Sequence, residues 1–226
     1  MRLQMNFLFS LLLSISFTTS FSQTKVLVFS KTAGFRHSSI VPGKPAIMKL
    51  GNQNGFSVDT TEDAAKFTDA NLKGYNAVIF LNTTGDVLNH FQQAAFERYI
   101  QSGGGFMGIH AATDCEYNWP WYGKLVGAYF KGHPKNQLAK LKVIDKSHGS
   151  TAHLPDVWER VDEWYNFKKA PSNEEVKVLI TIDEKSYQGG DNGDWHPMVW
   201  YHEFDGGRSF YTEFGHTNES FDDPNY

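Results

Sequence analysis

The sequence predicts an α/β fold with a mostly parallel central sheet, and three observations carry that prediction. Residues 25–30, 76–82 and 105–109 are short and almost wholly apolar runs, the pattern of strands buried on both faces. Stretches with apolar residues at helical spacing separate these runs. The connections are short, so consecutive strands are expected to pair in parallel through right-handed crossovers.

The N-terminal half predicts strands and helices in alternation. Ser38 or Ser39 is a candidate cap for the first helix, and Pro45 suits a helix that begins there and ends near Gly51. A helix that stops at a triple glycine is also expected, because glycine favours helix ends. The predicted elements are strand 25–30, helix 45–51, strand 56–59, a short helical turn at 67–72, strand 76–82, helix 89–101 and strand 105–109.

The C-terminal half is richer in aromatic residues and predicts further strands. Residues 116–130 are dense in tyrosine, tryptophan and phenylalanine, and 138–145 alternate as a half-buried strand does. Residues 176–182 form a clear apolar strand. Segments 196–204 and 208–213 predict an extra β-hairpin near the C-terminus, across an Asp-Gly-Gly turn.

The first 22 residues have the features of a signal peptide. A positive residue precedes an apolar run, and small residues stand before Gln23, the expected new N-terminus. The apolar run is too short to cross a bilayer comfortably, so the alternative of an N-terminal membrane anchor is less favoured. We therefore expect a periplasmic or secreted protein with one domain over residues 23–226 and no stable membrane anchor after cleavage.

Composition narrows the class of protein. About two hundred residues suit one well-buried domain. A formal net charge of -4, without a long basic run, argues against nucleic acid as a partner. The single cysteine, Cys115, excludes an intramolecular disulfide, and a buried small residue is a more common role for it than a nucleophile.

His110 is the first candidate for chemistry. It directly follows strand 105–109, and the carboxyl ends of strands in an open α/β sheet are where ligands bind. Gly108 before it and two alanines after it allow a sharp turn, as in the nucleophile elbows of hydrolases. Imidazole stands where such elbows carry serine or cysteine.

Several segments together resemble the ThuA-like family, which is named for trehalose utilisation. They are residues 34–37, 103–114, 133–134, 162–165, 196–197 and 215–217. The resemblance covers nearly the whole chain after the leader. It implies a flavodoxin-like three-layer fold of the class I glutamine amidotransferase-like type and a role in sugar or glycoside metabolism. Residues 221–226 resemble the lead-in to a further helix, so the domain is expected to be truncated at its C-terminal end.

The resemblance also shows a departure from amidotransferase chemistry. In glutamine amidotransferases of this fold the elbow holds a cysteine nucleophile, whereas here it holds His110. Cys115 lies five residues further on and cannot take the same place in a tight turn. Imidazole does not offer the thioester path, so glutaminase activity is not expected.

The predicted topology gathers polar residues at one sheet edge. Because histidine titrates near neutral pH, several imidazoles at one site suit proton transfer on a sugar hydroxyl or carbonyl. The candidate catalytic residues are His110, Asp114 and His216. The candidate substrate-binding residues are Arg36, His37, His133, Glu163, Trp164 and His196.

These residues leave more than one function open. The first is an enzyme that uses His-based acid/base chemistry on a sugar or glycoside, oxidised sugars included. A non-catalytic carbohydrate-binding domain and a metal-dependent hydrolase are the alternatives. No His-x-x-x-His or His-x-His spacing is present, so we expect no metal and no other cofactor. A homo-oligomer is compatible with the sequence.

Overall fold

The computed structural model describes residues 23–226, and the predicted signal peptide lies outside them. No helix in this described part is long and apolar enough to cross a membrane. The helices are α1 (Ile40–Asn54), α2 (Asp69–Leu72), α3 (His90–Gln101) and α4 (Pro120–Val126). The strands are β1 (Lys25–Phe29), β2 (Ser57–Thr61), β3 (Ala77–Leu81), β4 (Gly105–Ile109), β5 (Phe130–Gly132), β6 (Gln137–Val143), β7 (Val157–Asp162), β8 (Asn166–Phe167), β9 (Lys177–Ile182), β10 (Pro197–Phe204) and β11 (Gly207–Thr212).

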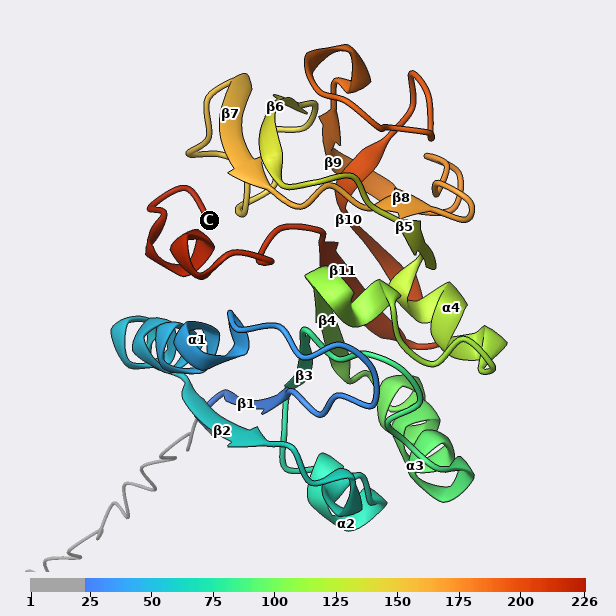
Figure 1. Cartoon of the computed structure of the whole chain (residues 1–226). Coiled ribbons are helices and arrows are strands. Elements are labelled where there is room, and N and C mark those ends of the chain that lie inside the picture. Colours follow the sequence, from blue (N-terminus) through green and yellow to red (C-terminus); the bar gives the residue numbers. More distant parts are fainter. Residues whose placement is uncertain (1–22) are drawn as a thin grey trace, which may run out of the picture.

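Nine of these strands form one sheet in the order β2-β1-β3-β4-β11-β10-β9-β6-β7 (Figure 1). The pairings from β2 to β11 are parallel, and those from β11 to β7 are antiparallel. The sheet is therefore mixed rather than mostly parallel, which corrects the expectation from the sequence. A connection of two residues joins β10 to β11, and a connection that short permits only antiparallel pairing. These two strands lie inside the sheet and are no addition to it.

The parallel end of the sheet is covered on both faces. Its strands are short runs of apolar residues, as expected for strands that helices bury from both sides. One cluster of apolar side chains packs α1 against alternate residues of β1, β3 and β4. The other cluster lies on the opposite face and includes residues of α3 and α4. Figure 1 shows α1 apart from α2, α3 and α4 around this end of the sheet.

Two elements differ from their predicted form. Helix α1 begins at Ile40 and runs through Pro45 to Asn54, because residues spaced along it pack on the sheet. Strand β7 was not predicted from the sequence. Its buried positions include the charged side chains of Arg160 and Asp162, while Val157 is exposed, so the usual polarity of an alternating strand is reversed.

The carboxyl ends of several strands meet at one edge of the sheet. Strands β1, β3, β4 and β11 run parallel, so the loops that follow them leave at the same edge. The directions alternate from β11 through β10, β9 and β6, and this alternation gives β7 the direction of β11. The loop after β7 therefore also leaves at this edge. Ligands of open α/β sheets bind outside such an edge.

Candidate functional site

His110 occupies a sharp and strained turn at the end of β4. Its backbone φ is 47°, in the left-handed region that non-glycine residues rarely adopt, and a short 3-10 helix follows it. Gly108 leaves room for this turn, since a Cβ atom at this position would lie in tight contact, 3.0 Å from both Ala112 and Tyr211. The turn has the elbow shape that the sequence predicts, and the side chain of His110 is fully buried.

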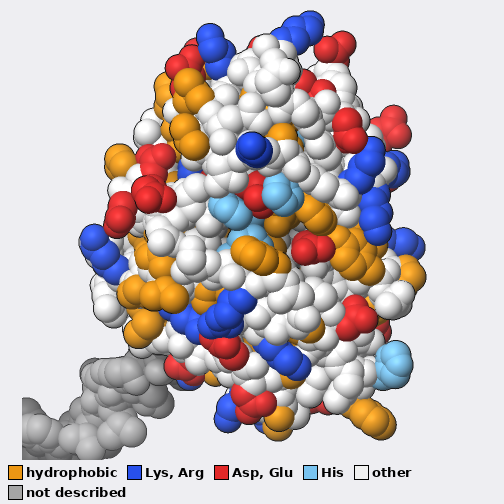
Figure 2. Space-filling view, viewed as in Figure 1, with side chains coloured by type: hydrophobic (Ala, Val, Ile, Leu, Met, Phe, Trp, Pro, Cys, Tyr) orange, Lys and Arg blue, Asp and Glu red, His pale blue; other side chains and the backbone are white. Residues whose placement is uncertain are grey.

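The carboxylate of Glu163 lies among three imidazoles. Its Oε2 is 3.4 Å from Nε2 of His110 and 3.1 Å from Nδ1 of His216. Its Oε1 is 2.9 Å from Nδ1 of His133. Figure 2 shows histidine and acidic side chains gathered on one face of the molecule.

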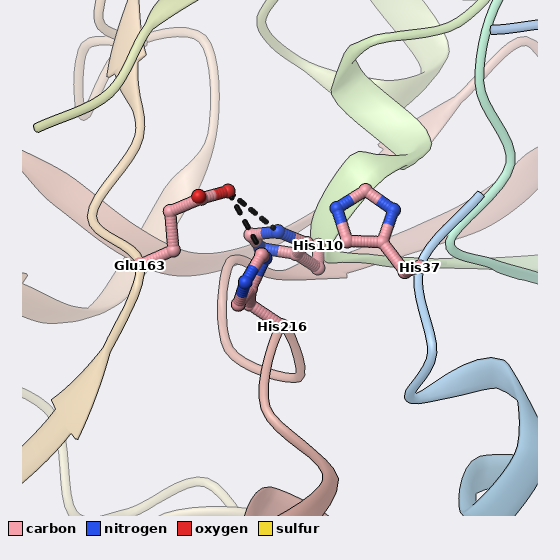
Figure 3. Close-up of side chains that lie close together, drawn as sticks. All are labelled: His37, His110, Glu163 and His216. Atoms are coloured by element: carbon pink, nitrogen blue, oxygen red, sulfur yellow. Dashed lines mark ion pairs between the residues drawn. The ribbon is translucent and has the colours of Figure 1, made fainter. Parts of the chain in front are cut away.

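His37 completes the group on the side away from Glu163. Its ring centre is 5.0 Å from that of His110 and 5.1 Å from that of His216, with the rings edge to face. We call His37, His110, Glu163 and His216 the His/Glu cluster. Figure 3 shows that the four side chains converge from four separate segments of the chain. One nitrogen or oxygen of each lies within 4.8 Å of the others.

Backbone and aromatic contacts fix His110. Its Nδ1 lies 2.7 Å from the main-chain oxygen of Glu213, so this nitrogen donates, and Nε2 faces the carboxylate of Glu163. The ring of Tyr165 lies against that of His110, with the ring centres 4.2 Å apart. The Tyr165 amide in turn donates to Oε1 of Glu213 at 2.9 Å. The imidazole therefore has one orientation and one tautomer.

Burial and neighbouring charge shift the pKa values of the cluster. Burial, and after it the nearby imidazoles of His110 and His216, lower the pKa of His37 to about 3. Burial opposes the charged form of His110 too, but the carboxylates of Glu163 and Glu213 outweigh it and raise its pKa. Burial likewise opposes ionisation of Glu163, yet His110 and His216 hold its pKa below the usual range. Glu163 is thus an ionised carboxylate in a buried place.

Asp114 lies beside the cluster at the end of the turn. Its Oδ1 accepts a hydrogen bond of 2.6 Å from the hydroxyl of Tyr117. Burial raises the pKa of the Asp114 carboxyl, while that hydrogen bond and the charges of His110 and His133 act against the rise. A carboxyl group with a raised pKa is suited to proton transfer near neutral pH.

Comparison with known proteins places this chain in a family. The family model described as "ThuA: Trehalose utilisation" matches residues 25–226. The chain belongs to the ThuA family. No functionally curated relative matches it.

Solved structures agree with the ThuA assignment. A ThuA-like protein from Bacteroides uniformis is 28% identical with a TM-score of 0.77, and the match covers 94% of this chain and 90% of that one. A ThuA-like protein from Parabacteroides merdae is 20% identical with a TM-score of 0.70, over 87% and 81% of the two chains. A β-galactosidase from Bacillus circulans shares the fold at 14% identity and a TM-score of 0.55, over 88% of this chain and 30% of its own.

The structure brings together most of the candidate residues of this ThuA-family chain. His37, His110, His133, Glu163 and His216 meet as described above, with Asp114 next to them. Three other candidates lie in different surroundings, namely Arg36, Trp164 and His196. The convergence of His37, His110, Glu163 and His216 follows from strand direction, because they follow strands that end at the same edge. His133 instead follows β5, which belongs to the separate two-stranded sheet.

The three separate candidates each have structural partners. Arg36 forms a two-pronged ion pair with Glu62, at 2.8 and 3.0 Å. Trp164 is fully buried and its indole donates to the main-chain oxygen of Gln137. His196 is also fully buried, with Nε2 at 2.8 Å from the Tyr165 carbonyl and Nδ1 at 2.8 Å from Glu184.

Two residues outside the list of candidate site residues support the cluster from behind. Asn82 has a φ of 51°, and its side-chain amide donates to Ser39 and to the carbonyl of Gly215. Asp162 accepts from the amides of Glu163 and Gly215. Asn82 directly follows β3, and this position in the chain indicates that it lies at the same sheet edge. Asp162 lies in segment 162–165, which carries the family resemblance, but its supporting role has no pattern in the sequence.

Proposed function

We propose that the chain is an enzyme of sugar or glycoside metabolism that transfers protons with imidazole and carboxylate groups. The observation that carries the proposal is the convergence of His110, His133 and His216 on Glu163 at the carboxyl edge of the sheet. The trehalose-utilisation family supports the sugar as substrate class. The β-galactosidase likeness supports the fold alone, at 14% identity.

The exposed fractions of the side chains indicate different roles for the members of the site. The side chains of His133 and His216 are 41% and 22% exposed, so they can touch a substrate together with the partly exposed Asp114. His110 is fully buried and contacts Glu163 instead. His133, His216 and Asp114 are therefore the proposed proton-transfer groups, and His110 orients the carboxylate between them.

The surroundings of Cys115 support a reaction other than glutamine hydrolysis. The thiol is buried and lies 3.1 Å from the carbonyl oxygen of Gly85. Burial raises the pKa of the Cys115 thiol well above its ordinary value, so the thiolate that such chemistry needs is disfavoured.

Product analysis on a sugar panel tests the proposal. The panel contains trehalose, other disaccharides and their keto-sugar forms. We expect turnover of at least one of them, and a loss of about 100-fold or more in kcat/KM for Asp114→Asn, since general acid/base groups contribute about that much. His153→Ala, an exposed imidazole on another loop, is the control and keeps full activity.

Two results would contradict the proposal. Calorimetric binding of a sugar without any product would favour a carbohydrate-binding domain, and activity unchanged in Asp114→Asn would remove the assigned role.

Export through residues 1–22 is part of the same proposal. We expect the mature protein to start at Gln23 and to be recovered outside the cytoplasm. N-terminal sequencing of the protein from each cell fraction tests this, and an uncleaved chain in the cytoplasm would contradict it.

A further inference from the structure

We propose that the His/Glu cluster binds one divalent transition-metal ion of the zinc type. The donors are one ring nitrogen each from His37, His110 and His216 and one carboxylate oxygen from Glu163, all within 4.8 Å of one another. Imidazole nitrogen and carboxylate oxygen are donors that zinc accepts. This inference goes beyond the proposed function, which requires no ion.

Unsatisfied buried nitrogens point to a ligand in the cluster. Polar atoms in protein interiors almost always have a hydrogen-bond partner. Within residues 23–226, Nδ1 of His37, Nε2 of His110 and Nδ1 of His216 have no partner in hydrogen-bond geometry. His37 and His110 are only 4% and 0% exposed, so bulk water does not satisfy them.

The surroundings of His110 match those of a metal-binding imidazole. Histidine ligands characteristically donate their second ring nitrogen to a carbonyl or carboxylate, which fixes the tautomer. Nδ1 of His110 meets this requirement through the main-chain oxygen of Glu213, at 2.7 Å. Nε2 of His110 then faces the other members of the cluster (Figure 3), and an ion that binds there replaces the proton on this nitrogen.

The spacing of the donors fits a tetrahedral ion after small movements. Zinc binds nitrogen and oxygen at about 2.0–2.1 Å, which places neighbouring donors about 3.3 Å apart. Two of the observed separations, 3.4 Å from His110 and 3.1 Å from His216 to the same oxygen of Glu163, are already close to that value. The remaining separations, of up to 4.8 Å, have to shorten by about 1.5 Å at most for all four donors to bind one ion.

The types of donor atom also indicate which class of metal ion the cluster would bind. Three imidazoles favour zinc, iron, nickel or copper, whereas magnesium and calcium prefer oxygen donors throughout. We choose zinc as the probe because it accepts four mixed nitrogen and oxygen ligands. With an ion bound, His216 is a ligand, so proton transfer is left to His133 and Asp114, which lie outside the donor set. An ion here would supply a Lewis acid at the same edge.

Metal content measured on the untagged protein tests the inference. The protein is stripped with a chelator, incubated with micromolar Zn²⁺, freed of excess metal and examined by elemental analysis. We expect one zinc per chain in the wild type and in His153→Ala, and less than a tenth of that in His37→Ala. Reloading with Co²⁺ should give the strong visible absorption of a four-coordinate ion, a readout independent of activity.

A second, more conservative variant distinguishes the loss of a metal ligand from misfolding. Glu163→Gln keeps the shape of the side chain and removes the charge, and we expect it to weaken zinc binding by at least about tenfold. Circular dichroism checks that each variant is folded. A wild type that retains no zinc, or full zinc content in folded His37→Ala and Glu163→Gln, would overturn the proposal.

Discussion

Asp162 joins the two segments that carry Glu163 and His216. Its Oδ1 accepts the amide of Glu163 at 3.0 Å, and its Oδ2 accepts the amide of Gly215 at 3.2 Å. The same Oδ2 lies 3.0 Å from the guanidinium of Arg160, which is itself buried. One carboxylate therefore orients two members of the cluster and neutralises a buried positive charge.

Replacement of this carboxylate should cost much stability. In Asp162→Asn the amide cannot neutralise Arg160, which keeps only a longer ion pair of 3.8 Å with Asp223. A buried charge that loses its close partner costs about 3–5 kcal/mol. Urea denaturation measures the free energy of unfolding. Asp156→Asn is the control, because Asp156 pairs with Lys146 at the surface and is 83% exposed, and its expected effect is about 0.5 kcal/mol or less. Equal effects in the two variants would remove the role assigned to Asp162.

Glu62 should make the stability of the protein depend on acid pH. Hydrogen bonds from Arg36 and then Lys44 lower its pKa from 4.5 to about 2. Because the folded state binds this proton less readily, the contribution of Glu62 is present above pH 4.5 and declines as the pH falls toward 2.

The unfolding free energy of Glu62→Gln across that pH range tests this. Wild type should be the more stable protein at pH 7, and the gap should close near pH 2. Glu174→Gln, an exposed glutamate in the segment before β9, should show no such closing gap. A gap for Glu62→Gln that is constant with pH would contradict the assignment.

At the residue scale, sequence reasoning works for groups that follow predictable strands. His110 was found from its place after an apolar run, and His37 and His216 from theirs. Such a residue can face the cluster or pair with a side chain outside it. Loop geometry decides between the two, and the local sequence does not encode that geometry. Arg36 and His37 are neighbours in the chain, yet one pairs with Glu62 and the other faces His110.

At the scale of elements, two helix ends allow a matched test. Gly103 follows α3 and Gly127 follows α4, and both have a φ of 94°. Alanine at either position incurs the left-handed strain of about 1–2 kcal/mol. A Cβ atom at Gly103 would meet nothing within 4 Å, whereas at Gly127 it would lie 2.5 Å from the indole nitrogen of Trp200.

The two alanine variants should therefore differ in stability. Gly103→Ala is expected to lose about 1–2 kcal/mol of unfolding free energy from strain alone. Gly127→Ala is expected to lose about 1–3 kcal/mol more from overpacking against Trp200, whose indole donates to Val126. Thermal or urea unfolding of both variants measures the difference. Equal losses would mean that the strained backbone alone explains both.

Elements with ordinary apolar patterns could be predicted, and those with unusual patterns could not. Strands β1, β3 and β4 bury apolar runs and were found within about a residue of their ends. In β7 the buried face carries Arg160 and Asp162, so burial there depends on mutual pairing that only the tertiary structure supplies. The mixed character of the sheet was missed for another reason: the sequence predicts the hairpin as an addition to the sheet, whereas β10 and β11 lie inside it and begin its antiparallel half.

At the scale of the whole molecule, the cluster joins both halves of the sheet. His37 and His110 follow strands of the parallel half, whereas Glu163 follows β7 at the far end of the antiparallel half. A search for closely spaced histidines could not find this donor set, because its members are separated by tens of residues. The expectation of no metal was based on local spacing, and local spacing does not test a site built from four loops.

Zinc should therefore stabilise the whole fold. An ion that binds only the folded state at a free concentration of 100 times its Kd adds about 2.7 kcal/mol. For a domain of this size each kcal/mol raises Tm by about 2–4 °C, so we expect a rise of about 5–10 °C. Scanning calorimetry with Zn²⁺ or Mg²⁺ measures the shift. His153→Ala should keep the zinc shift and Glu163→Gln should lose most of it, because only the latter removes a donor that links the two halves. An equal rise with magnesium would point to general charge screening instead of a site.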